Sequence, residues 1–266
     1  MNTSLIITTY NWPEALELVL KSVFRQSVLP NEIVIADDGS TKETESLISK
    51  IAEKSPIPII HSWQEDKGFR LSRSRNLAIV KASYEYIIFI DGDLILHRDF
   101  IKDHLENSKE GIYIQGSRAF LKREYSKKIL KNKDLSSPPS FFSSCLENRL
   151  NAIRLPFLTK ILFSRKNKNL SRVRSCNFSM FKKDILRVNG FNEDFTSWGQ
   201  EDSEFVQRLY FSGMHRRNIK FSALQFHIYH KKGKSNNQNI SLLNRTIDKE
   251  LTWCENGISN HLSKND

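Results

Sequence analysis

The stretch Tyr86 to Leu94, YIIFIDGDL, constrains the fold of this chain more than any other. Its first part is too apolar for a strand with one solvated face, so it predicts a strand inside a sheet that is covered on both sides. Asp91 and Asp93 follow at the carboxyl end, where open α/β sheets bind ligands, and Gly92 leaves room between them. Because two carboxylates this close repel each other, the pair favours a divalent cation with oxygen ligands, Mg²⁺ or Mn²⁺. The alternative is an Asp-Gly turn that simply ends the strand.

Short apolar runs and helical patterns alternate around this strand. They predict strands at residues 4–8, 32–36 and 57–61, and helices that begin at Asn11 as N-cap and cover 41–52 and 69–81. This alternation predicts an α/β fold, with a single doubly wound, mostly parallel sheet and helices on both faces. Neither a Gly-x-Gly-x-x-Gly motif nor a P-loop follows the first strand, which argues against a dinucleotide dehydrogenase or a P-loop protein.

The length of 266 residues suits one large or two small domains. Cys145, Cys176 and Cys254 form no Cys-x-x-Cys pair, so they predict neither a disulfide framework nor a zinc site and fit a reducing, cytosolic setting. The N-terminus has no basic region before its short apolar stretch, and no run of about eighteen apolar residues occurs. We therefore expect a protein that is neither secreted nor membrane-spanning.

One segment holds the excess positive charge. The chain has a net charge of +11, and residues 118–174 hold fifteen Lys and Arg against three acids. Such a segment seeks polyanions: nucleic acid, an anionic membrane surface or phosphorylated substrates. Its Lys-rich part at 122–140 predicts a mobile connection. Apolar residues then recur at helical spacing from Phe142 to Ile161, and Pro156 should kink or divide that helix.

A basic amphipathic helix of this kind can lie in a membrane interface, whereas the alternative is an ordinary helix packed on the domain. Nucleic-acid binding is a weaker third interpretation, because no recognised motif accompanies the charge. We expect residues 119–174 to bind an anionic membrane surface, and we expect no nucleic-acid partner.

Two loops near the acidic pair carry groups that suit a nucleotide. Asp38 follows the second strand, where it can accept a hydrogen bond from a base or a ribose; the alternative is an acid that supports a helix dipole. The stretch from Ser62 to Asn76 places several basic residues, among them Arg70 and Arg75, at the start of a helix that already favours phosphate. A solvated basic face is the alternative, but beside Asp91 a diphosphate is the natural partner.

The segment Asn189 to Glu204, NGFNEDFTSWGQEDSE, combines aromatic rings with acids. Faces such as those of Phe195 and Trp198 beside hydrogen-bond acceptors suit a sugar ring, and Gly199 permits close approach. The alternative is a loop that caps the helix predicted at Glu201–Phe211.

Two histidines, His227 and His230, lie three residues apart near the end of the chain. A lone histidine is usually structural. One that reaches a cation at Asp93 would complete the shell of that cation.

Six motifs occur in order along the chain: TTYN at 8–11, DDGS at 37–40, GFR and RN between 68 and 76, FIDGD at 89–93, NGFNEDFTSWGQED at 189–202 and FHIYHKKGKSNN at 226–237. The first four resemble those of inverting family 2 glycosyltransferases, which have the GT-A fold. The last two resemble the C-terminal half of β-1,4-galactosyltransferases and of bacterial chondroitin polymerases. The resemblance covers about residues 3–118 and 174–239, so it leaves out the basic segment and the tail.

The resemblance implies a UDP-sugar donor, with Asp38 at the base and Asp91 and Asp93 at the ribose and the metal. It also implies that His230 completes the shell of Mn²⁺, or of Mg²⁺ in its place. The other residues that we expect at the donor are Thr9, Tyr10, Asn11, Asp66, Arg70 and Arg75.

For the acid pair Glu201 and Asp202, the resemblance implies catalysis with Asp202 as the base. We expect Asp202 to have the unshifted acidity of an aspartate, so that it takes the acceptor proton only as the new bond forms, without a covalent sugar–enzyme adduct. Where the galactosyltransferase pattern has a third acid, this chain has Ser203, a departure that bears on the acceptor more than on the chemistry. The residues that we expect at the acceptor are Phe195, Trp198, Gly199 and Glu201.

We expect a nucleotide-sugar-binding half (1–118), a basic amphipathic insert (119–174), an acceptor and catalytic half (175–239) and a helical tail (240–266). The expected function is metal-dependent, inverting transfer of a hexose (glucose, galactose or an N-acetyl form) from a UDP-sugar to a lipid-linked glycan acceptor. This reaction would serve bacterial surface polysaccharide synthesis (O-antigen, capsule or lipooligosaccharide), with the protein cytoplasmic and peripheral on the inner face of the membrane. The alternatives are transfer to a soluble oligosaccharide and a catalytically silent module that binds a nucleotide or a sugar.

Overall fold

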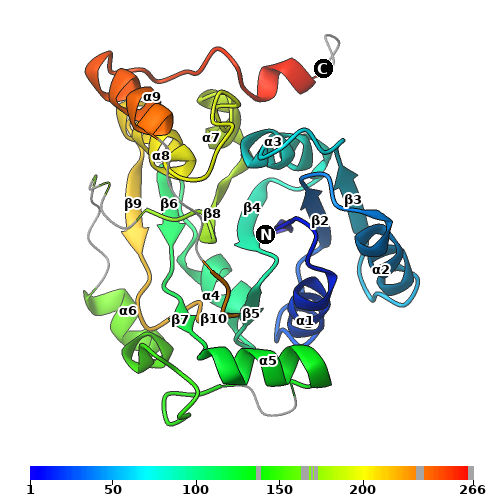
Figure 1. The fold of residues 1–266 in the computed structure, drawn as a ribbon. Helices are drawn as coiled ribbons and strands as arrows, with labels where there is room; N and C mark the ends of the chain where they lie inside the picture. The colour runs from blue at the N-terminus through cyan, green and yellow to red at the C-terminus, as the bar shows by residue number, and fades with distance from the viewer. Residues whose placement is uncertain (136–138, 163–167, 169, 171–172, 232–236, 263–266) are drawn as a thin grey trace.

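The computed structural model describes residues 1–135, 139–162, 168, 170, 173–231 and 237–262. Within these residues the central sheet has seven strands in the order β3-β2-β1-β4-β8-β6-β9 (Figure 1). The first four strands are parallel, β8 is antiparallel to both of its neighbours, and β9 is parallel to β6. The predicted α/β fold with a mostly parallel sheet is confirmed. The strands are β1 (Thr3–Thr9), β2 (Glu32–Asp37), β3 (Ile59–Trp63), β4 (Tyr86–Asp91), β6 (Ile112–Gln115), β8 (Asn177–Phe181) and β9 (His215–Asn218).

Helices cover both faces of this sheet, which is why its central strands are apolar on both sides. Successive side chains of a strand point to opposite faces, and in β1 Leu5 and Ile7 enter one core cluster while Ile6 enters another. The first cluster includes side chains of α1, α2 and α4, and the second includes side chains of α3, α7 and α8. The helices are α1 (Pro13–Val23), α2 (Lys42–Ala52), α3 (Leu71–Lys81), α4 (Phe100–Asn107), α5 (Arg123–Asn132), α6 (Pro156–Leu162), α7 (Lys182–Arg187), α8 (Glu201–Phe211) and α9 (Asn237–Asp248), with 3₁₀ turns at η1 (Arg149–Ala152) and η2 (Ile258–His261).

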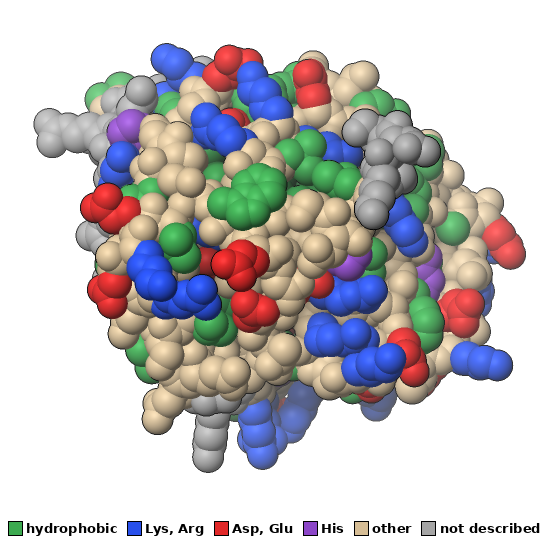
Figure 2. Space-filling model, turned by 90° about the horizontal axis from the view of Figure 1, so that it is seen from above, with side chains coloured by type: hydrophobic (Ala, Val, Ile, Leu, Met, Phe, Trp, Pro, Cys, Tyr) green, Lys and Arg blue, Asp and Glu red, His purple; other side chains and the backbone are tan. Residues whose placement is uncertain are grey.

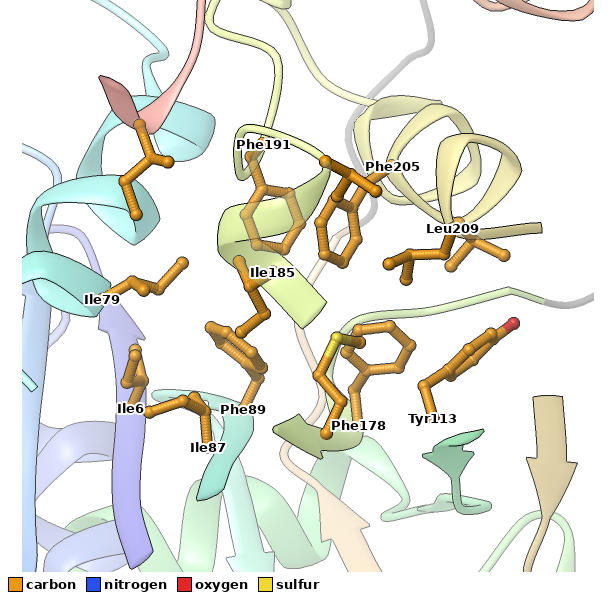
Figure 3. Packing of buried hydrophobic residues seen from close by; sticks show 14 of the residues in the cluster. Ile6, Ile79, Ile87, Phe89, Tyr113, Phe178, Ile185, Phe191, Phe205 and Leu209 are labelled. Carbon is orange, nitrogen blue, oxygen red and sulfur yellow. The ribbon is translucent and has the colours of Figure 1, made fainter. Parts of the chain in front are cut away.

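Figure 3 shows how the second cluster holds α8 and the loop before it against the sheet. The rings of Phe191 and Phe205 stack with their centroids 4.3 Å apart, and Phe191 meets the edge of Phe89 on β4. Each fully buried side chain of this size stabilises the fold by about 1.5–3 kcal/mol. The start of α8, where Glu201 and Asp202 lie, is therefore fixed relative to the central strand.

A second, three-stranded sheet, which the sequence analysis did not predict, lies beside the end of β4. Its order is β5 (Leu94–Leu96), β10 (Gln225–His227) and β7 (Ala119–Phe120), with β10 antiparallel to β5 and parallel to β7. Because β5 starts directly after Asp93, its pairing with β10 places His227 opposite Leu94. The backbone N–H of Ile228 donates to the carbonyl of Asp93 (2.9 Å), which fixes the same register.

The basic segment differs from its prediction in two ways. Much of the supposed mobile connection is a helix, α5, which docks near α1: Lys133 Nζ lies 2.6 Å from a carboxylate oxygen of Glu17, and Arg25 donates to the carbonyl of Leu135. Ser136 to Pro138 lie outside the described residues. No single helix spans 142–161 in the described chain; η1 and α6 divide that stretch, and Pro156 begins α6.

Three smaller differences concern element boundaries. The N-cap of α1 is Trp12, not Asn11, and Asn11 has a left-handed backbone (φ 47°) with its side-chain oxygen accepting from the backbone N–H of Thr41. Strand β3 begins two residues later than predicted, at Ile59, and α3 begins at Leu71. The left-handed turn at Asn11 therefore holds the end of β1 beside the start of α2 through this hydrogen bond.

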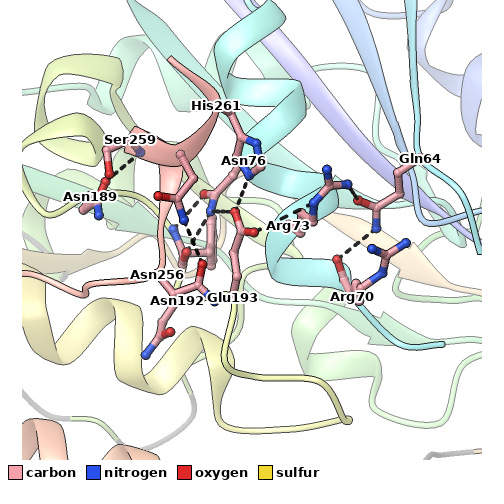
Figure 4. Close-up of polar contacts among 12 residues, drawn as sticks. Gln64, Arg70, Arg73, Asn76, Asn189, Asn192, Glu193, Asn256, Ser259 and His261 are labelled. Atoms are coloured by element: carbon pink, nitrogen blue, oxygen red, sulfur yellow. Dashed lines mark hydrogen bonds and ion pairs between the residues drawn. The ribbon is translucent and has the colours of Figure 1, made fainter. Parts of the chain in front are cut away.

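The C-terminal tail packs back on the molecule. After α9 it crosses above α3 and α7 in Figure 1, and η2 contacts α3. In the network of Figure 4, Glu193 Oε1 accepts from Asn76 on α3 (2.8 Å) and lies 2.7 Å from His261 Nε2, while Asn189 accepts from the backbone N–H of Ser259. Two parts of the chain far apart in sequence are thus joined to α3.

Figure 2 shows the face of the molecule that lies uppermost in Figure 1. Acidic and basic side chains both occur over this face, around several exposed hydrophobic ones. Helices α5 and α6 of the basic segment lie at the opposite, lower end of Figure 1. Among the described helices, none has the length and apolar character that crossing a membrane requires.

Candidate active site

A cleft of about 450 Å³ opens at the carboxyl ends of β1, β2 and β4, where the sequence predicts it. We call it the strand-end cleft. Gly92 is required there, because a Cβ at this position would lie 2.7 Å from the carbonyl oxygen of Thr8. The wall comprises Thr8, Thr9, Tyr10, Trp12, Asp38, Gly68, Phe69, Leu71, Asp91, Gly92, Asp93 and His230.

Asp38 is buried in the wall of this cleft and held by two donors. Its carboxylate accepts hydrogen bonds from the side chain of Gln64 and from the backbone N–H of Arg70 (2.9 Å). Burial raises the pKa of Asp38, and these hydrogen bonds oppose the rise. The carboxylate thus fastens the loop before α3, whereas α2 begins only at Lys42, so support of a helix dipole is not its main contact.

The other residues predicted to bind the UDP-sugar donor divide into two groups. Thr9 and Tyr10 line the cleft, and the Tyr10 hydroxyl donates to Asp66 Oδ2 (3.0 Å) at its rim. Asn11 is outside the cleft wall, as are Asp66 and Arg70, whose guanidinium donates to the carbonyl of Glu65. In this conformation these three residues position the surrounding loops.

Arg75 differs most from its expected place. Its side chain is 3% exposed, lies over the Phe191 ring and bridges two carboxylates, at 3.8 Å from Asp91 and 3.5 Å from Glu201. Asp91 also accepts a hydrogen bond from the Thr8 hydroxyl (3.0 Å). Burial raises the pKa of Asp91, and the charge of Arg75 opposes that rise. Arg75 is therefore a buried bridge between the end of β4 and α8. A residue that contacts the UDP-sugar would line the strand-end cleft, and Arg75 does not.

A group of metal-ligating atoms lies at the junction of the two sheets. Asp93 Oδ2 is 3.0 Å from His230 Nε2 and 3.4 Å from His227 Nε2, and one ligand atom from each residue lies within 4.8 Å of the others. Asp93 Oδ1 is buried and has no hydrogen-bond partner among the described residues. One carboxylate and two imidazoles fit a divalent cation, and the imidazoles suit a transition metal better than Mg²⁺.

This group differs from the predicted ligand set in one member. His227 takes the place expected for Asp91, which lies outside the cluster with Thr8 and Arg75 as its partners. The spacing of His227 and His230 was visible in the sequence, but only the pairing of β10 with β5 brings His227 to Asp93. The side-chain hydrogen bond to Asp93 raises the pKa of His230.

A second cleft of about 590 Å³, the loop cleft, adjoins the first and shares with it the wall residues Leu71, Asp91, Asp93 and His230. Its wall also holds Trp198, Gly199, Glu201 and Asp202, which the sequence analysis assigned to the acceptor and to catalysis. The Trp198 side chain is 47% exposed, as a platform for a ligand requires. Phe195 is completely buried, so the prediction that it contacts an acceptor is wrong for this conformation.

The loop before α8 is held in an unusual backbone conformation. Gly199 (φ 100°) and Gln200 (φ 74°) are both left-handed, which for a residue such as Gln200 costs on the order of 1 kcal/mol. Asn239 on α9 donates to the carbonyls of Ser197 (2.8 Å) and Gly199 (2.6 Å) and accepts from the Ser197 hydroxyl. Asn239 thus fixes the loop, and no motif in the sequence pointed to it.

Asp202 lies in the first turn of α8 and accepts a hydrogen bond from the backbone N–H of Ser175 (3.2 Å). Desolvation, and next the negative charge of Glu201, raise the pKa of Asp202 to about 7, against the opposing effect of Arg75. The expectation of ordinary aspartate acidity is therefore wrong. A carboxylate with this pKa is a stronger base than an ordinary aspartate and remains substantially ionised at neutral pH.

Two protein-family models match the chain. The model described as glycosyl transferase family 2 matches residues 4–190, and the model described as the N-terminal domain of galactosyltransferase matches residues 157–231. The first match runs through the basic segment, which the resemblance in the sequence motifs had left out.

Individual relatives agree with these models. Chondroitin synthase of Escherichia coli is 27% identical over 241 residues, which cover 84% of this chain and 34% of that protein. Validoxylamine A glucosyltransferase of Streptomyces hygroscopicus subsp. limoneus is 27% identical over 220 residues, 79% of this chain and 48% of that protein. The chain thus spans between about a third and a half of the length of these two relatives.

The fold has a match among solved structures. The structure of S. aureus TarS 1-349 in complex with UDP-GlcNAc has a TM-score of 0.65 and 16% identity, over 94% of this chain and 66% of that one. At this identity the likeness concerns the fold. The family 2 model, in contrast, matches well over half of the sequence, and the chain therefore belongs to glycosyltransferase family 2.

Proposed function

We propose that this chain transfers a hexose from a UDP-sugar to a glycan acceptor, with inversion at the anomeric carbon. The observation that carries the proposal is the place of Asp202, in the loop cleft, which adjoins the strand-end cleft at Asp93 and His230. In-line displacement requires a base on one side of the anomeric carbon and a stabilised leaving group on the other. The TarS structures with UDP and UDP-GlcNAc support a nucleotide-sugar as the donor.

The donor diphosphate belongs, in this proposal, in the strand-end cleft. Asp93, His227 and His230 would hold a divalent cation there, and when bound this cation would neutralise the charge of the leaving diphosphate. Asp91, oriented by Thr8 and Arg75, would accept a hydrogen bond from the ribose.

The acceptor belongs in the loop cleft. Asp202 takes the proton of the acceptor hydroxyl while the new glycosidic bond forms, so no covalent sugar–enzyme adduct arises. Glu201 Oε2 is buried and has no hydrogen-bond partner among the described residues, so it can accept from a second acceptor hydroxyl. Trp198 offers an apolar face for the acceptor ring. An α-linked UDP-hexose then yields a β-linked product.

We further propose a lipid-linked acceptor at the inner face of the cytoplasmic membrane. Large hydrophobic side chains are exposed in the basic segment, with exposed fractions of 88% for Phe142, 66% for Leu150, 61% for Phe157 and 69% for Ile161. Apolar side chains among Lys and Arg suit an anionic lipid surface, where each basic residue contributes about 1 kcal/mol. Sedimentation with anionic but not neutral vesicles, weakened by salt, is expected. Equal binding to both would favour a hydrophobic anchor, and binding to neither would contradict this part.

The function itself is tested by a donor screen. UDP release is measured with UDP-glucose, UDP-galactose and their N-acetyl forms in the presence of Mn²⁺, where water serves as a poor acceptor. Release from at least one donor is expected. If UDP binds but no donor releases it, with or without a panel of glycan acceptors, the alternative of a silent nucleotide-binding module is correct.

A further inference from the structure

A third cavity, of about 710 Å³, lies beyond the loop cleft. The two share the wall residues Arg118, Phe120, Arg174 and Cys176, whereas this cavity shares none with the strand-end cleft. We call it the basic cavity, because Arg118, Arg174, Arg216 and Lys220 line it and its wall contains no acidic residue.

The four cations of the basic cavity come from separate parts of the fold. Arg118 lies between β6 and β7, Arg174 precedes β8, Arg216 is in β9, and Lys220 follows β9. The other polar residues of the wall include side-chain amides, such as those of Asn148 and Asn218. The tertiary structure therefore brings these four cations together, although they are not neighbours in the sequence.

In the part of the chain that the structure describes, the contacts of two of these cations include no carboxylate. The Arg118 guanidinium contacts the sulfur of Cys176 and the ring of Phe120, and the Lys220 ammonium lies over Phe221. Within the described residues, neither forms an ion pair with a carboxylate. Other guanidinium groups do, as Arg154 does with Asp103 (2.7 Å). Cations that line one cavity whose wall holds no acidic residue repel one another there, so the site favours an anionic ligand.

We infer that the basic cavity binds a phosphate-containing group of the acceptor, an inference that rests on the proposed function. Arg118 and Arg174 line both the loop cleft and the basic cavity, so the two spaces are adjacent. An acceptor whose reactive hydroxyl lies at Asp202 would therefore extend towards the basic cavity. A phosphate or diphosphate carries enough charge and oxygen atoms for several cations, whereas one carboxylate satisfies a single bidentate arginine. The phosphate has two chemical sources: a diphosphate that joins the glycan to a lipid, or a phosphodiester within the glycan.

The first experiment needs no knowledge of the acceptor. Binding of inorganic pyrophosphate to the full chain is measured by calorimetry in the presence of a chelator, so that no cation recruits pyrophosphate to Asp93. The double variant Arg174→Gln/Lys220→Gln removes two cavity charges, and Lys128→Gln/Lys131→Gln removes two exposed charges of α5 as the matched control.

The expected loss of pyrophosphate affinity is about 10-fold or more in the cavity variant, with the control like the wild type. UDP affinity in Mn²⁺ serves as the test of folding and should stay within about twofold in both variants. Equal pyrophosphate affinity of wild type and cavity variant, or equal losses in both variants, would overturn the inference.

The second experiment identifies the source and separates this inference from the proposed function. The KM for transfer is compared between a lipid-diphosphate glycan, a glycan with an internal phosphodiester and the same glycan without phosphate. The cavity variant should raise KM by at least about 10-fold for one phosphate-bearing acceptor, and that acceptor names the source. The same rise for the phosphate-free glycan would overturn the inference. Absence of UDP release from every donor would count against the proposed function alone, since the pyrophosphate result is independent of turnover.

Discussion

The two clefts of the site are built in different ways. The strand-end cleft consists largely of residues at or just after the carboxyl ends of β1, β2 and β4, so parallel strand pairing brings Thr9, Asp38 and Asp91 to one edge. The loop cleft depends on contacts between remote segments, such as those of Asn239 with the loop before α8 and of Arg75 with Glu201. A site at strand ends follows from the sheet, whereas a site made by a loop needs a second element to hold that loop. Variants should therefore affect the two clefts differently.

The largest effect is expected at the cation cluster. Chelation of divalent cations, or Asp93→Ala, should reduce sugar transfer to background, because the leaving diphosphate would lose its neutralising charge. Turnover is measured as UDP release, and the far-UV spectrum verifies folding. Glu106→Ala, which removes an exposed carboxylate on α4, is the control. Full activity in EDTA would contradict the role given to Asp93, His227 and His230.

Asp202→Asn should come next, with a loss of about 10²–10⁴-fold in the rate of transfer. The amide keeps the shape of the side chain but is no base, and UDP-sugar affinity should persist because Asp202 does not line the strand-end cleft. Asp194→Asn, a change in an acid of the same segment, serves as the matched control. A variant that remains active and makes β-linked product would assign the base to Glu201. Retained α configuration, seen by NMR of the product, would contradict inversion.

The pH dependence sharpens the comparison further. Because the pKa of Asp202 is raised to about 7, protonation removes the base below that pH, and kcat/KM should fall about tenfold per unit towards acid and level off above. Glu201→Gln removes a charge that raises this pKa, so the acid limb should move to lower pH. UDP affinity, measured over the same range, is the control for donor binding. An acid limb centred near pH 4 in the wild type would contradict the raised pKa.

The smallest effect concerns the clamp on the loop cleft. Asn239→Ala removes the side chain that satisfies the carbonyls of Ser197 and Gly199, which should cost about 1–3 kcal/mol of stability and raise the acceptor KM several-fold. UDP affinity should hardly change. Ser241→Ala, also on α9, is the control because its hydroxyl donates to Asn237 in an exposed contact. An equal rise in the donor and acceptor KM values would show that the clefts are not independent.

The same distinction explains how much the sequence predicts. Apolar runs locate β1, β2 and β4 to within a residue or two, and the acids that follow them are placed at the sheet edge by geometry alone. The helix Glu201–Phe211 is predicted with its observed bounds, because acids mark its first turn. These features depend on local pattern, and local pattern is what a sequence displays.

The errors come from contacts between distant residues. A Lys-rich stretch predicted as mobile is helix α5, fixed by Lys133 at Glu17. The sequence suggests that Arg75 binds phosphate, yet its guanidinium lies between the carboxylates of Asp91 and Glu201. The pKa of Asp202 rises because of surrounding protein atoms that no motif reveals. The roles proposed for the site residues, and the four predicted segments, stay predictions.

The pairing of β5 with β10 has a consequence for how the chain folds. Asp93 and its histidine partners are separated by about half of the chain, so the cation cluster is a contact of high sequence separation. Loop closure of that length is entropically costly, and contacts of this kind slow folding. During synthesis the first strands can assemble before His227 and His230 have been translated. The capacity to hold a cation thus arises only once nearly the whole domain has emerged.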